Sequence, residues 1–181
     1  MSEPSGPQWC ARFPGSVSPN DLLPDFRDRV LAFISAMHRA GATVHIAATY
    51  RPPERAYLMH WCCMIADSGQ DPSHVPAMHG VAIDWGHGGD VHEARVAAAA
   101  MKKVYAIQFP AALVSRHTQH RAIDMTISWV GTLKISDFNG QERVITNPPR
   151  SGLNQVLVDV GRSFGVIKLL TDPPHWSDDG H

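Results

Sequence analysis

The chain has 181 residues, of which 44% are hydrophobic and 18% are charged. This composition is that of a folded protein and argues against disorder. The length predicts a single domain with a sizeable core. The formal net charge of −1 argues against a broad phosphate-binding surface, so we do not expect a nucleic-acid partner.

The cysteines and the N-terminus bear on the compartment. Three cysteines, with Cys62 and Cys63 adjacent, form neither a disulfide framework nor a CxxC pair, and we expect the adjacent pair to be buried in a helix. The first residues contain an acid, prolines and a tryptophan in place of a basic region and an apolar run, so no signal peptide is expected. No stretch reaches the ~20 apolar residues of a membrane span. The oligomeric state stays open.

Taken in chain order, residues 1–20 are rich in Pro, Ser and Gly and predict an extended arm, followed by one domain over 21–181. Apolar periodicity and helix-start residues predict four helices, at residues 22–40, 53–66, 90–105 and 151–165. Apolar runs and alternation predict strands, at residues 43–49, 122–146 (an antiparallel meander) and 166–170. The expected fold class is α+β, with the helices packed on one side of a small antiparallel sheet. We expect the last five residues to be frayed.

Two short stretches combine side chains that bind divalent metals. In residues 115–124, His117 and Asp124 are seven residues apart, and the second stretch is Asp172-Pro173-Pro174-His175. Two imidazoles and one carboxylate are a common ligand set for zinc and leave a fourth position open for water. The sequence therefore indicates one zinc ion held by His117, Asp124 and His175. Asp172, three residues before the last ligand, is the candidate general base.

A third stretch, residues 80–85, repeats half of this pattern. The position seven residues before Asp84 is Ala77, so Asp84 lacks the histidine partner that the pattern requires. We expect Asp84 to lie near the ligands, lining the cleft or supporting structure. The alternative is that His79 or His87 brings Asp84 to a metal.

The first stretch, Ser115-x-His117-x-x-His120-x-Ala122-x-Asp124, resembles the Ser-x-His-x-x-Gly-x-Ala-x-Asp motif of the zinc D,D-carboxypeptidases and L-alanyl-D-glutamate endopeptidases. The second, Asp172-x-x-His175, resembles their Glu/Asp-x-x-His motif. These enzymes cut peptidoglycan and share the fold of the hedgehog signalling domain. The resemblance implies this fold, a zinc ion on the three ligands, and Asp172 as the catalytic base.

The resemblance also implies roles around the metal. Tyr50-Arg51-Pro52 is similar to a Tyr-Arg-Ser/Pro turn of the family, so Arg51 is expected to bind a substrate carboxylate or to stabilise the oxyanion. Ser115 is expected to contact the peptide or to orient the motif. Trp176 is expected either to line the substrate cleft or to pack in the core. His120 stands where the family has Gly, and is expected to support the ligands or to be an extra ligand.

The implied activity is zinc-dependent hydrolysis of peptide bonds in peptidoglycan stem peptides. An Asp followed by a Pro-His pair resembles the endopeptidase branch more than the carboxypeptidase branch. Two alternatives remain open, a non-catalytic zinc-stabilised module that binds cell wall or protein, and a D-Ala-D-Ala dipeptidase. Without a signal peptide, the enzyme would reach the wall after lysis or through dedicated secretion.

Overall fold

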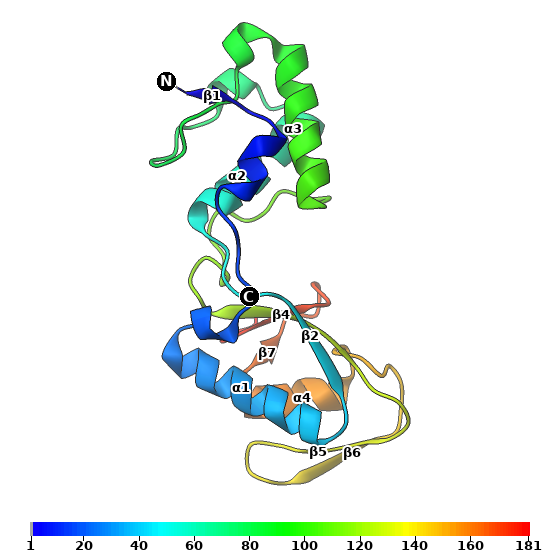
Figure 1. Cartoon of the computed structure of the whole chain (residues 1–181). Helices are drawn as coiled ribbons and strands as arrows, with labels where there is room; N and C mark the ends of the chain where they lie inside the picture. The colour runs from blue at the N-terminus through cyan, green and yellow to red at the C-terminus, as the bar shows by residue number, and fades with distance from the viewer. Residues whose placement is uncertain (1) are drawn as a thin grey trace. The chain divides into compact units, whose positions relative to one another are not determined.

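The computed structural model describes residues 2–181 and divides the chain into two compact units (Figure 1). Unit 1 combines the segment up to Gly15 with Arg51–Val114, and unit 2 combines Ser16–Tyr50 with Ser115–His181. The sequence does not predict this division, and the single domain expected over residues 21–181 stays a prediction. The expected extended arm is not fully extended, because residues 7–11 form a 3-10 helix whose Trp9 is buried in the core of unit 1.

Unit 1 is built around two helices, α2 (Pro53–Asp67) and α3 (Val91–Tyr105). Pro53 opens α2, where its missing N–H has no helical partner to lose. The Asp90 side chain caps α3 by accepting the backbone N–H of Glu93 at 3.0 Å. The remaining short elements of the unit are β1 (Glu3–Pro4), η1 (Pro7–Ala11), η3 (Pro72–His74), β3 (Ile83–Asp84) and η4 (His87–Gly89). Strand β1 pairs with β3 in parallel.

Unit 2 contains a four-stranded antiparallel sheet in the order β2-β4-β8-β7. Its strands are β2 (Thr43–Ala48), β4 (Ala122–Ser128), β7 (Ile167–Lys168) and β8 (His175–Ser177). A separate hairpin joins β5 (Leu133–Ser136) to β6 (Glu142–Ile145). The meander expected over residues 122–146 is therefore wrong in one respect, because β5 pairs with β6 and not with β4.

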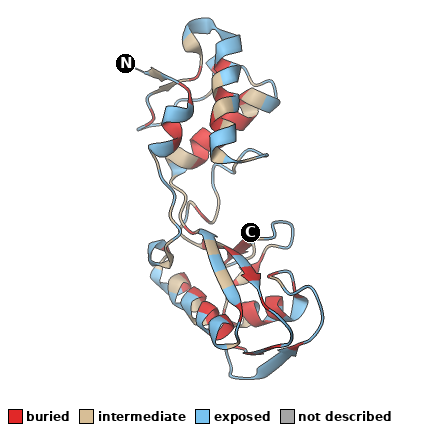
Figure 2. Cartoon of the chain, turned by 45° about the vertical axis from the view of Figure 1, so that its right-hand side comes forward, coloured by how far each residue is buried: buried red, intermediate tan, exposed pale blue. Residues whose placement is uncertain are grey.

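The helices of unit 2 are α1 (Pro24–Arg39) and α4 (Gln155–Ser163), with a 3-10 turn η2 (Pro19–Asp21) before them. Residues of both helices pack in one core with Ile123, Met125 and Ile127 of β4, and Figure 2 shows the buried positions on helices and strands. Because successive strand residues point to opposite faces, Asp124 lies on the face away from this core. The expected α+β class is confirmed.

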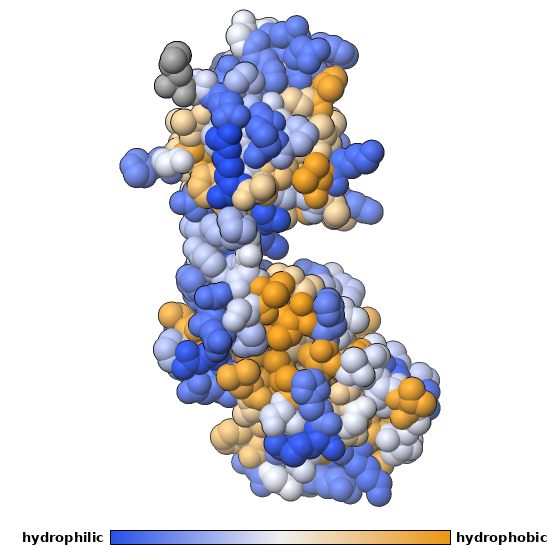
Figure 3. Space-filling model, viewed as in Figure 1, coloured by the Kyte–Doolittle hydropathy of each residue, from blue (hydrophilic) through white to orange (hydrophobic). Residues whose placement is uncertain are grey.

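None of the helices within residues 2–181 has the length and apolar content that crossing a bilayer requires. On the face drawn in Figure 3, polar residues are interspersed with apolar ones, and apolar residues gather in a patch on unit 2.

Candidate metal centre

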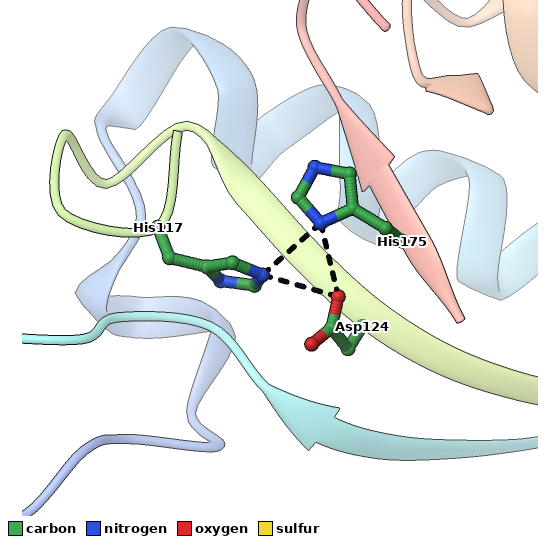
Figure 4. A group of neighbouring side chains, drawn as sticks. All are labelled: His117, Asp124 and His175. Atoms are coloured by element: carbon green, nitrogen blue, oxygen red, sulfur yellow. Dashed lines mark hydrogen bonds and ion pairs between the residues drawn. The ribbon is translucent and has the colours of Figure 1, made fainter. Parts of the chain in front are cut away.

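Three side chains from distant parts of unit 2 converge on one point (Figure 4). His117 Nε2 lies 3.1 Å from Asp124 Oδ1 and 3.2 Å from His175 Nδ1, and His175 Nδ1 lies 3.2 Å from Asp124 Oδ1. The two histidines are buried, at 3% and 6% exposure. The three residues that the motifs singled out as ligands are therefore brought together.

The sheet explains why Asp124 and His175 meet. Asp124 lies in the central strand β4, where its direct partners are Ala48 of β2 on one side and His175 of β8 on the other. Directly opposed residues of antiparallel strands hold their Cβ atoms about 5 Å apart on the same face. Strand pairing thus brings Asp124 and His175 together, although they are 51 residues apart in the sequence.

His117 reaches the same point from the tight turn that precedes β4. Ser115 and Thr118 hold this turn together, because the Ser115 N–H donates to Thr118 Oγ1 at 3.0 Å and Thr118 Oγ1 donates to the Ser115 carbonyl at 2.8 Å. His120 ends the turn with a left-handed φ of 60°. Of the two roles expected for Ser115, the structure supports orientation of the motif.

Backbone carbonyls orient both imidazole rings. His117 Nδ1 lies 2.8 Å from the Thr49 carbonyl oxygen, and His175 Nε2 lies 3.1 Å from the His181 carbonyl oxygen. A carbonyl oxygen only accepts, so each of these ring nitrogens must donate its hydrogen. In a neutral ring the other nitrogen then carries a lone pair, and these are the two nitrogens that face Asp124. Such outer hydrogen bonds are how proteins fix metal-binding histidines.

The consequence is a cluster of three acceptors with no hydrogen between them. Two ring lone pairs and one carboxylate oxygen at about 3 Å repel one another unless positive charge lies among them. A tetrahedral ion with bonds of about 2.0 Å holds its ligand atoms about 3.3 Å apart, close to the observed 3.1–3.2 Å. The His117–Asp124–His175 group can therefore bind a metal ion.

The surroundings of Asp124 favour the ionised form of its carboxyl group. Burial raises the pKa of its carboxyl group, but in the metal-free group hydrogen bonds and positive charge from protonated His117 and His175 rings outweigh burial and hold the pKa well below its ordinary value. The carboxylate is therefore charged near neutral pH, which is the form that coordinates metals.

Asp172 lies on the exposed turn that leads into His175. Its backbone carbonyl accepts the His175 N–H at 3.0 Å, so the two residues are one tight turn apart. The Asp172 carboxylate is not one of the three converging groups. Its role as a base stays a prediction.

His120 is not one of the converging ligands either. Its Nδ1 lies 2.6 Å from the Asp21 carbonyl oxygen, and its ring stacks on Tyr50 with centroids 3.8 Å apart and planes within 8°. Tyr50 follows Thr49, whose carbonyl orients His117. The supporting role expected for His120 thus has a physical route, through Tyr50 and Thr49.

The expectation that Trp176 lines the substrate cleft is wrong, and the alternative that it packs in the core is correct. Its neighbour His175 points to the metal face, so Trp176 points to the opposite face of β8. There it is fully buried and packs against Phe33 with ring centroids 5.4 Å apart.

Two other predicted residues, Arg51 and Asp84, belong to unit 1. Asp84 lies in β3, and its Oδ1 accepts the Gly86 N–H at 2.8 Å, which supports a turn. It is not part of the metal-binding group that the described residues form. Arg51 begins the second segment of unit 1, and its role toward a substrate stays a prediction.

The sequence did not reveal the two carbonyls that orient the ligands, since every residue has one. The His181 carbonyl is available because the last residues fold back instead of fraying. Ser177 Oγ accepts the N–H groups of Gly180 and His181 at 2.8 and 3.1 Å. Ser177, two residues after His175 and followed by two Asp and a Gly, was the available signal for this turn.

A cavity of about 310 Å³ lies next to the ligand-bearing segments of unit 2. Pro174 of its wall directly precedes His175, and Thr126 lies two residues from Asp124 on the same face of β4. The lining is apolar or hydroxyl-bearing and consists of Met125, Thr126, Ile127, Ser151, Gly152, Leu153, Pro173 and Pro174.

Comparison of the sequence with protein-family models and with curated proteins finds no match.

Proposed function

We propose that this protein is a zinc-dependent peptidase that hydrolyses peptide bonds in the stem peptides of peptidoglycan. The observation that carries the proposal is the convergence of His117 Nε2, Asp124 Oδ1 and His175 Nδ1, each about 3.2 Å from the others. The motif resemblance supplies the reaction and the substrate class. The proposal includes the hedgehog-type fold for unit 2, in which an antiparallel sheet with helices on one face is the compatible feature.

Zinc is the metal proposed because of the donor set. Two imidazoles and a carboxylate suit zinc, and three protein ligands are the number that catalytic zinc sites use. When bound, zinc supplies acidification of water and polarisation of the scissile carbonyl. His117, Asp124 and His175 hold the ion, while the Thr49 and His181 carbonyls hold the two rings in their ligating tautomers.

Asp172 is proposed as the general base. Its position on an exposed turn, one hydrogen-bonded turn before a ligand, allows it to meet water and substrate while staying near the metal group. It would accept a proton from the attacking water as the C–O bond forms, and return that proton to the leaving nitrogen as the C–N bond breaks. Arg51 is proposed to bind a substrate carboxylate or the oxyanion. The Asp and the Pro-His pair favour the endopeptidase branch.

The test combines metal analysis with product analysis on defined muropeptides. The wild-type protein is expected to hold one zinc ion and to release a new amine, and mass spectrometry identifies the bond cut. Asp172→Asn keeps the shape of the side chain and is expected to retain zinc and to lose turnover by at least about 100-fold. Asp28→Asn, an exposed acid of helix α1, is the matched control and should retain both.

The outcomes separate the proposal from its alternatives. A wild-type protein that holds zinc but cuts no muropeptide is a binding module of the same fold, not a peptidase. Cleavage of the free D-Ala-D-Ala dipeptide alone would make it a dipeptidase. Loss of zinc from Asp172→Asn would show that Asp172 acts in metal binding instead of proton transfer.

A further inference from the structure

Lys168 is a buried lysine whose three ammonium N–H groups all have hydrogen-bond acceptors. The residue is 6% exposed, and its Nζ lies 2.7 Å from the Leu169 carbonyl oxygen, 2.6 Å from that of Asp172 and 3.0 Å from that of His175. An ammonium group has three N–H donors and no acceptor. All three donors of Lys168 are therefore matched by main-chain carbonyls of one loop.

The same carbonyls are joined to one another by backbone hydrogen bonds. The Leu169 N–H donates to the His175 oxygen at 3.1 Å, the Asp172 N–H to the Leu169 oxygen at 3.3 Å, and the His175 N–H to the Asp172 oxygen at 3.0 Å. These bonds form a closed ring, which we call the carbonyl ring, of Leu169, Asp172 and His175. Each carbonyl of the ring accepts one backbone N–H and one N–H of Lys168.

The carbonyl ring carries the two residues that matter most to the proposed reaction, the ligand His175 and the candidate base Asp172. Between them lie Pro173 and Pro174, which have no N–H to donate. The backbone of the loop thus has more carbonyl acceptors than N–H donors, and the ammonium group of Lys168 supplies three further N–H donors. The Pro174 carbonyl in turn accepts the Met125 N–H at 2.8 Å, which ties the loop to the strand that holds Asp124.

A buried ammonium group is costly unless it is paired or fully hydrogen-bonded. Here the carbonyl dipoles of the ring point at the charge, and the Trp176 ring lies 5.5 Å from Nζ, within the range of a cation–π contact. A methionine would fill a similar space without any of this polar matching. The polar arrangement therefore needs a reason beyond packing.

We propose that Lys168 is a positioning residue that fixes the loop of Asp172 and His175 relative to Asp124, so that the metal site is formed before the metal binds. Its effect on metal binding rests on the metal site alone, and its effect on turnover rests on the proposed peptidase function. Removal of outer groups that orient metal ligands typically costs 10- to 100-fold in metal affinity. We expect about this loss of zinc affinity in Lys168→Met.

The experiment compares wild type, Lys168→Met and Lys168→Arg, with Lys134→Met as the control, since Lys134 is an exposed lysine of β5 in the same unit. Zinc affinity is measured on the metal-free proteins by competition with a chelator. Amide hydrogen exchange is measured by NMR on the same metal-free proteins. Lys168→Arg should lose less zinc affinity than Lys168→Met, because it keeps the charge. It should still lose some affinity, because the planar guanidinium fork cannot place three donors on a ring of carbonyls.

We expect the three amides of the carbonyl ring to exchange faster in Lys168→Met, while amides of strands β5 and β6 keep their wild-type protection. Equal loss of protection throughout unit 2 would show that Lys168 acts on overall stability and would overturn the proposal. So would unchanged exchange in the ring. If Lys168→Met fails to fold, amide exchange of the carbonyl ring and of strands β5 and β6 is compared between Lys168→Arg and wild type, and the same two outcomes support or overturn the proposal.

The exchange measurement also separates this inference from the peptidase proposal. Localised loss of protection in a protein that binds zinc and cuts no muropeptide would leave Lys168 as a positioning residue of a non-catalytic metal site. Unchanged ring protection in a protein that does cut muropeptides would refute the role of Lys168 and leave the peptidase proposal standing.

Discussion

His120 offers the sharpest test of how the ligand turn is held, because it sits in a conformation that favours glycine. Its φ is 60°, and a residue with a Cβ in this region loses about 1 kcal/mol relative to glycine. Against this, the ring stacks on Tyr50, which contributes about 0.5–1.5 kcal/mol. The hydrogen bond from Nδ1 to the Asp21 carbonyl contributes about 0.5–1.5 kcal/mol more.

These magnitudes predict an order of stability. His120→Ala loses both contacts and keeps the strain, so the free energy of unfolding should fall by about 1–3 kcal/mol. His120→Gly loses the same contacts but relieves the strain, so its loss should be smaller by about 1 kcal/mol. Wild type should be the most stable of the three and the alanine variant the least.

The assay is denaturant-dependent hydrogen exchange at the amides of β4, which reports on unit 2 by itself. A glycine variant more stable than wild type would show that the strain outweighs the stack and the hydrogen bond. Equal stability of the glycine and alanine variants would show that the left-handed backbone stores no strain. Zinc affinity should fall in both variants, since Tyr50 adjoins the carbonyl that orients His117.

Three further outcomes are expected. Ser177→Ala should weaken zinc binding by a few-fold, up to about 10-fold, because the tail that brings the His181 carbonyl to His175 loses its anchor; a chelator competition that shows unchanged affinity would exclude this role of the tail. His117→Ala should release the metal, and atomic spectroscopy of the purified variant checks this. Burial raises the pKa of the Cys62 thiol far above its usual range, so little of the reactive thiolate forms at pH 8. Alkylation of native protein at that pH should spare Cys62, and mass spectrometry showing its fast labelling would contradict the buried position.

Much of the metal site follows from residue type and spacing. His117 and Asp124 were recognisable because a turn and the start of a strand need only a few residues to fold back. His175 was recognisable as a ligand type three residues after an acid, and the role of that acid, Asp172, stays a prediction. What spacing does not show is pairing over long distances, so the register of Asp124 with His175 had to come from the structure.

The cleft position expected for Trp176 was wrong because the sequence did not predict strand β8, which contains this residue. Residues 175–177 form strand β8, whereas a strand was expected only over 166–170. Had residue 175 been placed in a strand, alternation would have put Trp176 on the core face. A three-residue strand of mixed polarity has too few positions to show a period.

The four predicted helices are present, and the start of α2 at Pro53 was predicted because local chemistry decides it. Helices α1 and α4 begin later than predicted, at Pro24 and Gln155 instead of residues 22 and 151. The division into two units was not predicted. Neither helix carries a sequence signal for its partner, and only packing determines that α1 joins the sheet core and α2 joins Trp9.

The division into units has a consequence for biosynthesis. The last residue of unit 1 is Val114, so this unit can fold while the remainder is still being translated. Unit 2 must wait, because helix α1 and strand β2 are made early whereas the central strand β4 emerges only after unit 1 is complete. The metal-binding group is thus complete only after His175 has been added, and a nascent chain halted before that residue lacks one of the three converging side chains.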